Sequence, residues 1–560
     1  MRKAFELPEL QTVIAHFLDP KDLFSCSLVS KNWSYAYSSF LWRKVFLESN
    51  IKSPTLSAIQ KHGHHTRILL LGDTRDKEHF LIYFNQLTVL KLLDFNRDID
   101  DEEDEYDHED ESEDEDEDER QGELNVREEV EGKASMYSDD VVQLIIRNQT
   151  TLRVFECHSP SQKMPISGLR AILSCSKLEE LMTTCTIYSG LEDMLVKTCS
   201  RLKRFVSIED EFSLGNDRLS GGNSEWSNIT TLSIQNPKCI SDEIQLVMDC
   251  IKRCPQLQTL IWNTKKRPTG KSLISELLPA CPKLNSFSIR NSALHDSDIS
   301  KLLEAMNQVR ILKIERAYDV YGGHSIGQKS FSSLQSHFST LENIYLREAR
   351  YIKSQHVQEI LASCPSLRLI EASKILAKDI RDGTPWVCTR LRSFRVSITG
   401  ISDSIAGGAA KAVFKQLSRL RQLYELNVGC DHSSGIRYGL DLKLEAGLDA
   451  LAELTQLQYI CVRGLDLTMT AEDVDWVGQH WKSLMVWDGR LHAFWRQNAE
   501  RTKQLKSYGV RLDAYDNSNV PGFQDEYLSW RELKKIADGK RRLWVDQCTC
   551  LSDGEDSDEA

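Results

Sequence analysis

Few residues in this sequence are spaced for metal chemistry. His62, His64 and His65 lie close together, and Cys548 and Cys550 form a single Cys-x-Cys pair near the end. A structural zinc site takes four ligands, usually in paired spacings, and neither group supplies them. We therefore interpret the histidines as part of a polar loop and expect no metal or other cofactor.

Signatures of catalysis are missing as well. The chain has no G-x-S-x-G, no H-E-x-x-H and no G-x-x-x-x-G-K-[ST] motif, and the stretch "GGAAKA" near Gly407 lacks the phosphate-loop spacing. Without a secretory signal, the 15 cysteines are expected to be reduced and mostly buried. We predict a protein that is not an enzyme. A weaker alternative places an unrecognised site in residues 503–545, whose Trp and Tyr residues we interpret as capping.

Charge is distributed unevenly along the 560 residues. The net charge is −13, but residues 98–120 contain a dense acidic run and residues 552–560 form an acidic tail. Such runs repel themselves and disfavour nucleic-acid binding, so we predict that both are disordered and that nucleic acid is not a partner. No apolar run is long enough for a membrane span, and we expect the protein in the cytoplasm and/or nucleus.

The elements that must position any binding residues are repeats of the form L-x-x-L-x-L. In each repeat the fourth and sixth residues alternate inward as on a strand, and a helix-like stretch such as "SQHVQEILASC" precedes the next copy. One strand and one helix cannot bury their own apolar faces, whereas stacked copies can. The copies begin at Leu87, Leu152, Leu178, Leu202, Ile229, Leu257, Leu284, Val309, Leu341, Leu367, Leu391, Leu423 and Leu457, with a degraded copy at Leu484.

This pattern, with a Cys before several strands, resembles cysteine-containing leucine-rich repeats. The resemblance implies an α/β solenoid shaped as a horseshoe, with parallel strands on the concave face and helices outside. We expect a small three-helix module before it. The expected organisation is a module at 1–48, linker and first repeat at 49–97, an acidic insertion at 98–135, repeats at 136–500, a C-terminal cap at 501–546 and a tail at 547–560.

The opening residues are too apolar for so small a module. Leu10, Val13, Ile14 and Phe17 follow the spacing of one helical face, and 18 of the 40 residues from Leu7 to Phe46 are large and apolar. A piece of this size has little interior, so some of these side chains must lie on its surface. Contiguous exposed apolar surface usually marks a partner site.

The stretch "LPEL…VIAHFL…DLFSCSLVSKNW…LW" resembles an F-box. An F-box followed by leucine-rich repeats implies the substrate-recognition subunit of an SCF-type ubiquitin ligase. In that family the F-box docks on a Skp adaptor, which joins it to a cullin–RING ligase, and the repeats capture a target for ubiquitination and proteasomal degradation. The docking residues implied here are Leu7, Pro8, Leu10, Ile14, Leu23, Leu28, Val29 and Trp42, while Trp33 is an alternative core residue.

The strand register also suggests where a target would bind. Residues between and after the inward positions face the concave side, and several are basic or aromatic. An arginine-rich stripe favours an acidic or phosphorylated target. Two further interpretations stay open: a solvated face with scattered charge, and a stripe that holds the chain's own acidic insertion. The candidate target-binding residues are Arg290, Lys313, Tyr345, Arg347, Arg395 and Arg463.

Two functions from different classes remain. The first is the ligase substrate receptor, in which the catalytic chemistry belongs to other subunits. The second is a repeat scaffold that binds proteins without any ligase role, its opening helices serving only to cap the solenoid. Binding of a Skp adaptor by the chain is expected for the ligase receptor and not for the scaffold.

Overall fold

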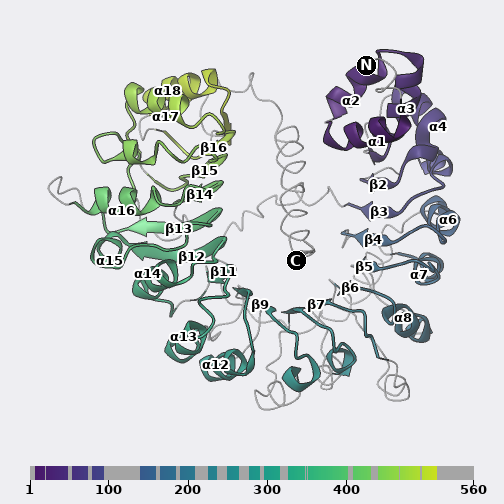
Figure 1. Ribbon diagram of the computed structural model, residues 1–560, viewed down its shortest axis with the longest axis horizontal. Helices are drawn as coiled ribbons and strands as arrows, with labels where there is room; N and C mark the ends of the chain where they lie inside the picture. The colour runs from purple at the N-terminus through teal and green to yellow at the C-terminus, as the bar shows by residue number, and fades with distance from the viewer. Residues whose placement is uncertain are drawn as a thin grey trace, which may run out of the picture. The chain divides into compact units, whose positions relative to one another are not determined.

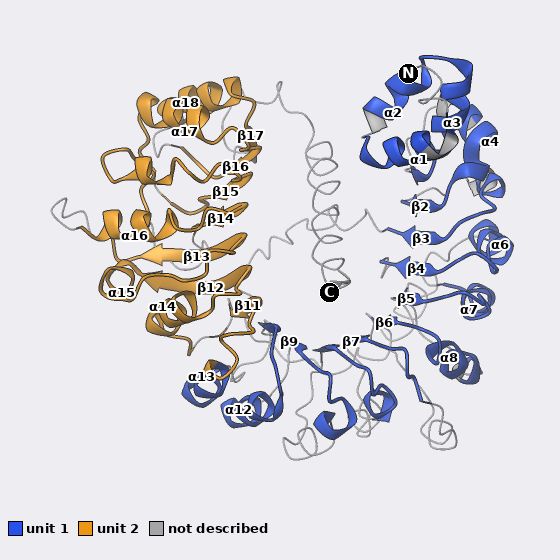
Figure 2. Cartoon of the chain, viewed as in Figure 1, with its two compact units in different colours: residues 1–334 blue, residues 335–560 orange. Residues whose placement is uncertain are grey.

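The structure is a computed structural model that divides into two compact units, residues 1–334 and 335–560 (Figure 2). The expected acidic insertion and tail lie outside the described residues. The described residues are 7–18, 20–47, 53–72, 78–93, 139–158, 164–183, 190–207, 225–235, 249–263, 277–290, 295–315, 326–346, 349, 351–401, 408–429, 439–465, 467–491 and 495–513.

Unit 1 begins with three short helices and continues as a stack of parallel strands. Each strand from β1 to β10 pairs in parallel with the next one along the chain. Helices α6, α7 and α8 lie on one side of this sheet (Figure 1). The elements are α1 (Pro8–Phe17), α2 (Pro20–Ser27), α3 (Lys31–Leu41), β1 (Lys44–Leu47), α4 (Ser53–His62), β2 (Ile68–Leu71), β3 (Val89–Leu92), α6 (Asp139–Arg147), β4 (Val154–Cys157), α7 (Ile166–Leu173), β5 (Glu180–Thr183), α8 (Glu192–Cys199), β6 (Arg204–Ser207), β7 (Thr231–Gln235), β8 (Thr259–Asn263), β9 (Ser286–Arg290), α12 (Asp296–Ala305) and β10 (Ile311–Glu315).

Unit 2 repeats the same arrangement with seven strands, β11 to β17, again parallel and in chain order. Its helices lie on one side of the sheet, and the other side of the sheet is its strand face (Figure 1). The elements are α13 (Gln328–Gln335), which spans the boundary between the units, β11 (Asn343–Leu346), α14 (Ser354–Ser363), β12 (Leu369–Leu376), α15 (Ala377–Asp382), β13 (Ser393–Thr399), α16 (Ala409–Leu417), β14 (Glu425–Asn427), β15 (Tyr459–Cys461), α17 (Ala471–His480), β16 (Val486–Asp488), α18 (Trp495–Ser507) and β17 (Arg511–Asp513).

The core is built from the repeat positions that the sequence predicts. In the copy at Leu391, the side chains of Leu391, Phe394 and Val396 are all buried. The cysteines before the strands are buried as well, and burial raises the pKa of Cys281 and Cys388 to about 12. These thiols therefore act as small core residues. The α/β solenoid of leucine-rich-repeat type is confirmed in each unit.

The strand stack begins earlier than the repeat pattern indicates. Strands β1 and β2 precede the copy at Leu87, and their register aligns Trp42 and Thr66 with its leading leucine. The backbone shows the same continuity, since Arg43 O accepts from the amides of Arg67 and Ile68 just as Arg67 O accepts from Thr88 and Val89. A repeat search misses both copies because neither begins with an aliphatic residue.

The stack also continues past residue 500, where we expected a cap without repeats. Strand β17 pairs in parallel with β16, and α18 packs beside α17 with Leu505 fully buried. The region up to residue 513 is therefore one more helix–strand copy, and the rest of the expected cap lies outside the described residues. No helix in the described ranges is both long and apolar enough to cross a membrane.

Candidate functional site

The first three helices form a small module with its own core. Ala15, Leu23 and Tyr37 are buried at its centre, and Trp33 and Phe40 pack against them. Ser30 begins α3 by accepting a hydrogen bond on Oγ from the amide of Trp33 at 3.2 Å. The core position of Trp33 agrees with the alternative reading of that residue.

Helix α1 is oriented with its large apolar side chains outward. Gln11 and Ala15 face the core, with 5% and 4% of their surface exposed, whereas Val13 is 54% and Phe17 84% exposed. Leu10 lies on the same outer side, at 41% exposed. A helix that buries its small and polar residues while exposing its large apolar ones has its apolar face available to another molecule.

The outward side chains of α1 are joined by others from the rest of the module. Phe24, Leu28 and Val29 are 57%, 70% and 65% exposed at and after α2. Most of the large exposed apolar side chains among the described residues belong to this module. We call seven of them, the aliphatic and Phe side chains on and beside α1 and α2, the exposed apolar residues: Leu7, Leu10, Val13, Phe17, Phe24, Leu28 and Val29.

The predicted docking residues fall into three environments. Four are in the exposed set, namely Leu7, Leu10, Leu28 and Val29, and Ile14 is half-buried. Leu23 needs a correction: it is only 6% exposed, because it points from α2 into the module core. Its role is to hold the helices together. The side chain of Pro8 lies outside the described residues, although Pro8 begins α1.

Trp42 is half-buried and joins the module to the strand stack. It follows α3 directly, occupies the leading position of the first repeat, and stacks on His62 with ring centroids 5.3 Å apart. His62, His64 and His65 are therefore placed at this junction by ring contacts. Burial, together with neighbouring cations, lowers the pKa of both His62 and His65. Uncharged rings suit this stacking role.

The predicted target-binding residues are spread over both units. Lys313 on β10 and Tyr345 on β11 are half-buried at the strand face. The side chain of Arg290 and all of Arg347 lie outside the described residues. Arg395 and Arg463 are held by acids, so they do not present unpaired positive charge.

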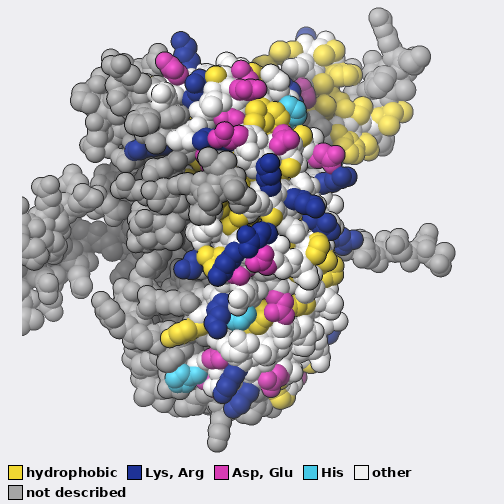
Figure 3. All heavy atoms as spheres, turned by 90° about the vertical axis from the view of Figure 1, so that its left-hand side faces the viewer, with side chains coloured by type: hydrophobic (Ala, Val, Ile, Leu, Met, Phe, Trp, Pro, Cys, Tyr) yellow, Lys and Arg dark blue, Asp and Glu magenta, His cyan; other side chains and the backbone are white. Residues whose placement is uncertain are grey.

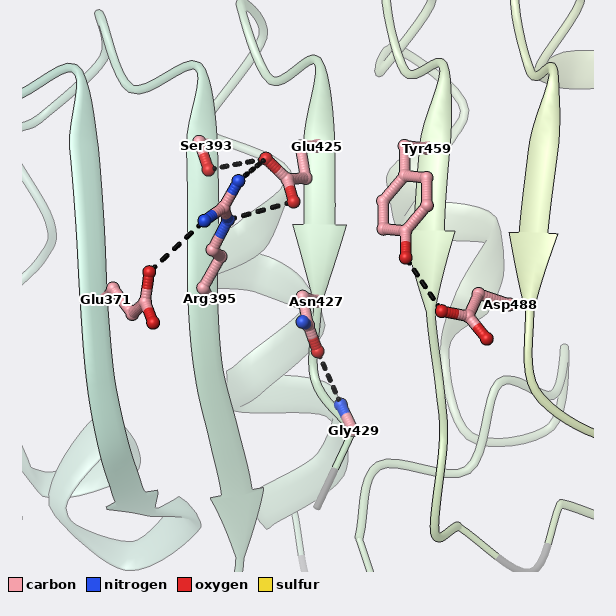
Figure 4. Close-up of polar contacts among 8 residues, drawn as sticks. All are labelled: Glu371, Ser393, Arg395, Glu425, Asn427, Gly429, Tyr459 and Asp488. Carbon is pink, nitrogen blue, oxygen red and sulfur yellow. Dashed lines mark hydrogen bonds and ion pairs between the residues drawn. The ribbon is translucent and has the colours of Figure 1, made fainter. Parts of the chain in front are cut away.

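Arg395 on β13 sits between two glutamates from the neighbouring strands (Figure 4). It donates from Nε to Glu425 Oε1 at 2.9 Å and from Nη2 to Glu425 Oε2 at 3.0 Å, while Nη1 donates to Glu371 Oε2 at 3.2 Å. Ser393 Oγ also donates to Glu425, at 2.8 Å. Burial alone would lower the pKa of Arg395, but Glu425 and then Glu371 raise it above its ordinary value.

A second buried acid lies further along the same strand face (Figure 4). Asp488 on β16 is 1% exposed, accepts from Tyr459 Oη at 2.7 Å and pairs with Arg463 Nε. Between the two networks, Asn427 Oδ1 accepts from the amide of Gly429 at 3.1 Å. A Cβ at Gly429 would lie 2.8 Å from Arg463 O, so only glycine fits this turn.

Unit 1 has a corresponding network that the sequence reasoning missed. Glu156 on β4 is 7% exposed, with Lys91 Nζ at 2.9 Å and His158 Nε2 at 3.1 Å from its Oε2 atom. Arg204 NH1 on β6 lies 3.9 Å from Oε1. The signal was present in the sequence, because Lys91 and Glu156 are both the fifth residue of successive copies, a position that faces the concave side.

The strand faces of the described residues carry polar networks of ion pairs and hydrogen bonds. In the part of the chain that the structure describes, no group of three or more His, Cys, Asp or Glu side chains is arranged to hold a metal ion. Figure 3, which views the left-hand side of Figure 1, shows basic and acidic side chains interspersed over the helix side of unit 2. On the strand faces, the polar networks described above extend over several neighbouring strands.

Comparison with known families identifies the opening module. Residues 8–48 match the family model described as F-box-like. No curated protein gives a significant match to the chain. The chain therefore carries an F-box-like domain, and the structure places leucine-rich repeats directly after it.

The solved structures that match the chain have low sequence identity and low TM-scores. The Rad7 and Elc1 complex from yeast has 14% identity and a TM-score of 0.38, covering 72% of this chain and 93% of that chain. An internalin from Listeria monocytogenes has 12% identity and a TM-score of 0.26, covering 67% and 83%. The complex of TLR13 with ssRNA13 has 12% identity and a TM-score of 0.30, covering 81% and 62%.

Proposed function

We propose that this protein is the substrate-recognition subunit of an SCF-type ubiquitin ligase. The observation that carries the proposal is the outward orientation of α1, which exposes Val13 and Phe17 while Gln11 and Ala15 face the core. A Skp-type adaptor that covers the exposed apolar residues would remove this surface from water, and the burial would drive association.

The repeats supply the second binding function in this proposal. Their strand faces carry preorganised polar networks, and the strand stack starts directly after the three helices of the opening module, because β1 begins three residues after α3 ends. The protein would act by proximity, holding a target near a ubiquitin donor carried by other subunits. The alternative is a binding scaffold in which the opening module only caps the strand stack.

Adaptor binding by the full chain tests the proposal. Phe17→Asp combined with Leu28→Asp places two charges in the exposed apolar residues, and we expect adaptor affinity to fall by at least about 100-fold. The melting temperature should stay within a few degrees of wild type, since both side chains already face solvent. Binding is measured by co-purification and by titration with a purified Skp-type adaptor.

A matched control keeps the result specific. Ile166→Asp adds the same charge at a position on α7 that is 46% exposed, outside the module, and should leave adaptor binding unchanged. If wild type binds no Skp-type adaptor, or if the double variant binds as wild type does, the scaffold function is favoured instead.

A further inference from the structure

The Arg395 network on unit 2 has a composition that does not suit an anionic ligand. One guanidinium lies between two carboxylates, Glu371 and Glu425, whose side chains are 17% and 12% exposed. Their combined charge outweighs that of Arg395. An acidic or phosphorylated segment would have to approach both carboxylates at close range, and like charges at this distance repel.

The hydrogen bonds of Arg395 also fix how its guanidinium is presented. Three of its nitrogens donate along the sheet to groups on the two neighbouring strands, as Figure 4 shows. Its side chain remains 29% exposed. With Nε, Nη1 and Nη2 all donating to Glu371 or Glu425, a ligand that leaves these hydrogen bonds intact would contact the guanidinium through its planar face.

A guanidinium held in this way suits an aromatic ring. Arginine stacks on aromatic side chains through its planar face, and the interaction strengthens where water is partly excluded. Flanking carboxylates favour the approach of a ring, whose edge carries partial positive charge, over that of an anion. Tyr459, half-buried on β15 next to Glu425, adds a second ring beside the network.

We propose that the Glu371–Arg395–Glu425 network is a target-binding site for an aromatic side chain, which stacks on the guanidinium of Arg395. The proposal rests on the proposed role of the repeats in target capture and names the chemistry of the target segment. It replaces the acidic or phosphorylated target that the sequence favours at this position.

The test uses the full chain and an array of synthetic peptides that differ at one central position. That position carries Trp, Tyr, Leu, Asp, phosphoserine or Lys in otherwise identical sequences, and selected peptides are titrated by fluorescence anisotropy. We expect Trp and Tyr peptides to bind about tenfold more tightly than Leu peptides. Arg395→Lys keeps the positive charge but lacks the planar guanidinium, so it should abolish the preference for Trp and Tyr peptides over Leu peptides.

Two further variants separate stacking from charge. Glu371→Gln keeps an acceptor for Arg395 and should leave the binding of Trp peptides within about threefold, whereas a site for anions would bind phosphoserine peptides more tightly. Arg421→Lys is the matched control, because Arg421 forms an exposed ion pair with Glu453 at 2.7 Å. This variant should leave the affinity for every peptide unchanged. Thermal melting curves check that each variant folds.

The outcomes are decisive in both directions. An aromatic preference that depends on Arg395 supports the proposal. A preference for Asp, phosphoserine or Lys, an aromatic preference unchanged in Arg395→Lys, or no gain of Trp over Leu overturns it. The peptide affinities are measured both with and without the adaptor. A chain that binds no adaptor would contradict the proposed function, whereas the peptide preference would still be measured on the chain alone and would still test the aromatic site.

Discussion

Buried acids on the strand faces are each compensated by cations from neighbouring copies. Glu156 in unit 1 and Glu425 in unit 2 are both buried, and each pairs with at least one basic side chain that reaches it across the sheet. An unpaired carboxylate at such a position would be costly. These residues therefore link adjacent copies, and their charge state is coupled to folding.

Glu156 gives a prediction about pH. Burial alone would raise the pKa of Glu156, but the hydrogen bond from His158 and the charge of Lys91 lower it to about 2. A depressed folded-state pKa contributes stability above the unfolded value, near 4.5 for this group, that is lost as pH falls toward 2. Glu156→Gln should destabilise the protein by about 3 kcal/mol at pH 7.

Urea unfolding of wild type and Glu156→Gln at several pH values measures this effect. The difference in unfolding free energy should narrow as pH is lowered from 5 to about 3, since wild-type Glu156 becomes protonated in the unfolded chain. A difference that stays constant over this range would contradict the assignment of the low pKa to Glu156.

At the scale of elements, polar side chains tie some helices to a neighbouring segment of the stack. Half-buried Asp296, at the start of α12, accepts hydrogen bonds from the amides of Gly327, Lys329 and Ser330, at and just before the start of α13. Asn148, which follows α6, is 1% exposed. It accepts a hydrogen bond from the amide of Leu87, which precedes the acidic insertion in sequence. Such side chains satisfy backbone groups that neither helix nor strand pairs.

Asn148 is the clearest of these to test. Its Nδ2 donates to Phe84 O at 3.0 Å and Leu144 O at 2.8 Å, and its Oδ1 accepts from the amide of Leu87 at 2.7 Å. Asn148→Ala leaves these buried groups unpaired and should cost about 3 kcal/mol of unfolding free energy.

Asn228→Ala serves as the control in the same denaturation measurement. Asn228 also donates to a backbone carbonyl, that of Ser200 at 3.2 Å, but it is exposed to solvent. Its loss should cost well under 1 kcal/mol because water replaces the bond. Equal losses of unfolding free energy in the two variants would show that the burial of Asn148 does not cause its larger contribution to stability.

At the scale of the whole molecule, the strand stack of unit 1 is continuous across the acidic insertion. The described residues stop at Leu93 and resume at Asp139, yet β3 and β4 pair directly, with Leu90 opposite Phe155. In sequence, residues 98–135 therefore lie between two strands that pair directly with each other.

Replacing residues 98–135 by a short Gly/Ser linker should keep the fold. We expect a melting temperature within a few degrees of wild type, because a shorter loop costs slightly less entropy to close. Adaptor affinity should be unchanged, since the exposed apolar residues lie elsewhere. Circular dichroism melting and the adaptor titration check both. A large loss of stability would indicate that the insertion contributes to the folded core.

The amino-acid sequence by itself determined the repeat fold and the presence of an apolar helical face in the opening module. Both depend on local periodicity, as in the copy at Leu391 and in the stripe from Leu10 to Phe17. Periodicity fails where the leading residue changes, so β1 and β2, led by Trp42 and Thr66, were not predicted.

Only the tertiary structure decided which way the apolar face of α1 points and which charges are compensated. Leu23 and Leu28 are the same residue type on one short stretch, yet one is buried and the other is 70% exposed. Arg395 meets its partners 24 and 30 residues away in sequence, because parallel stacking brings β12 and β14 to either side of β13. Such lateral contacts arise from assembly of the copies, which no single segment encodes.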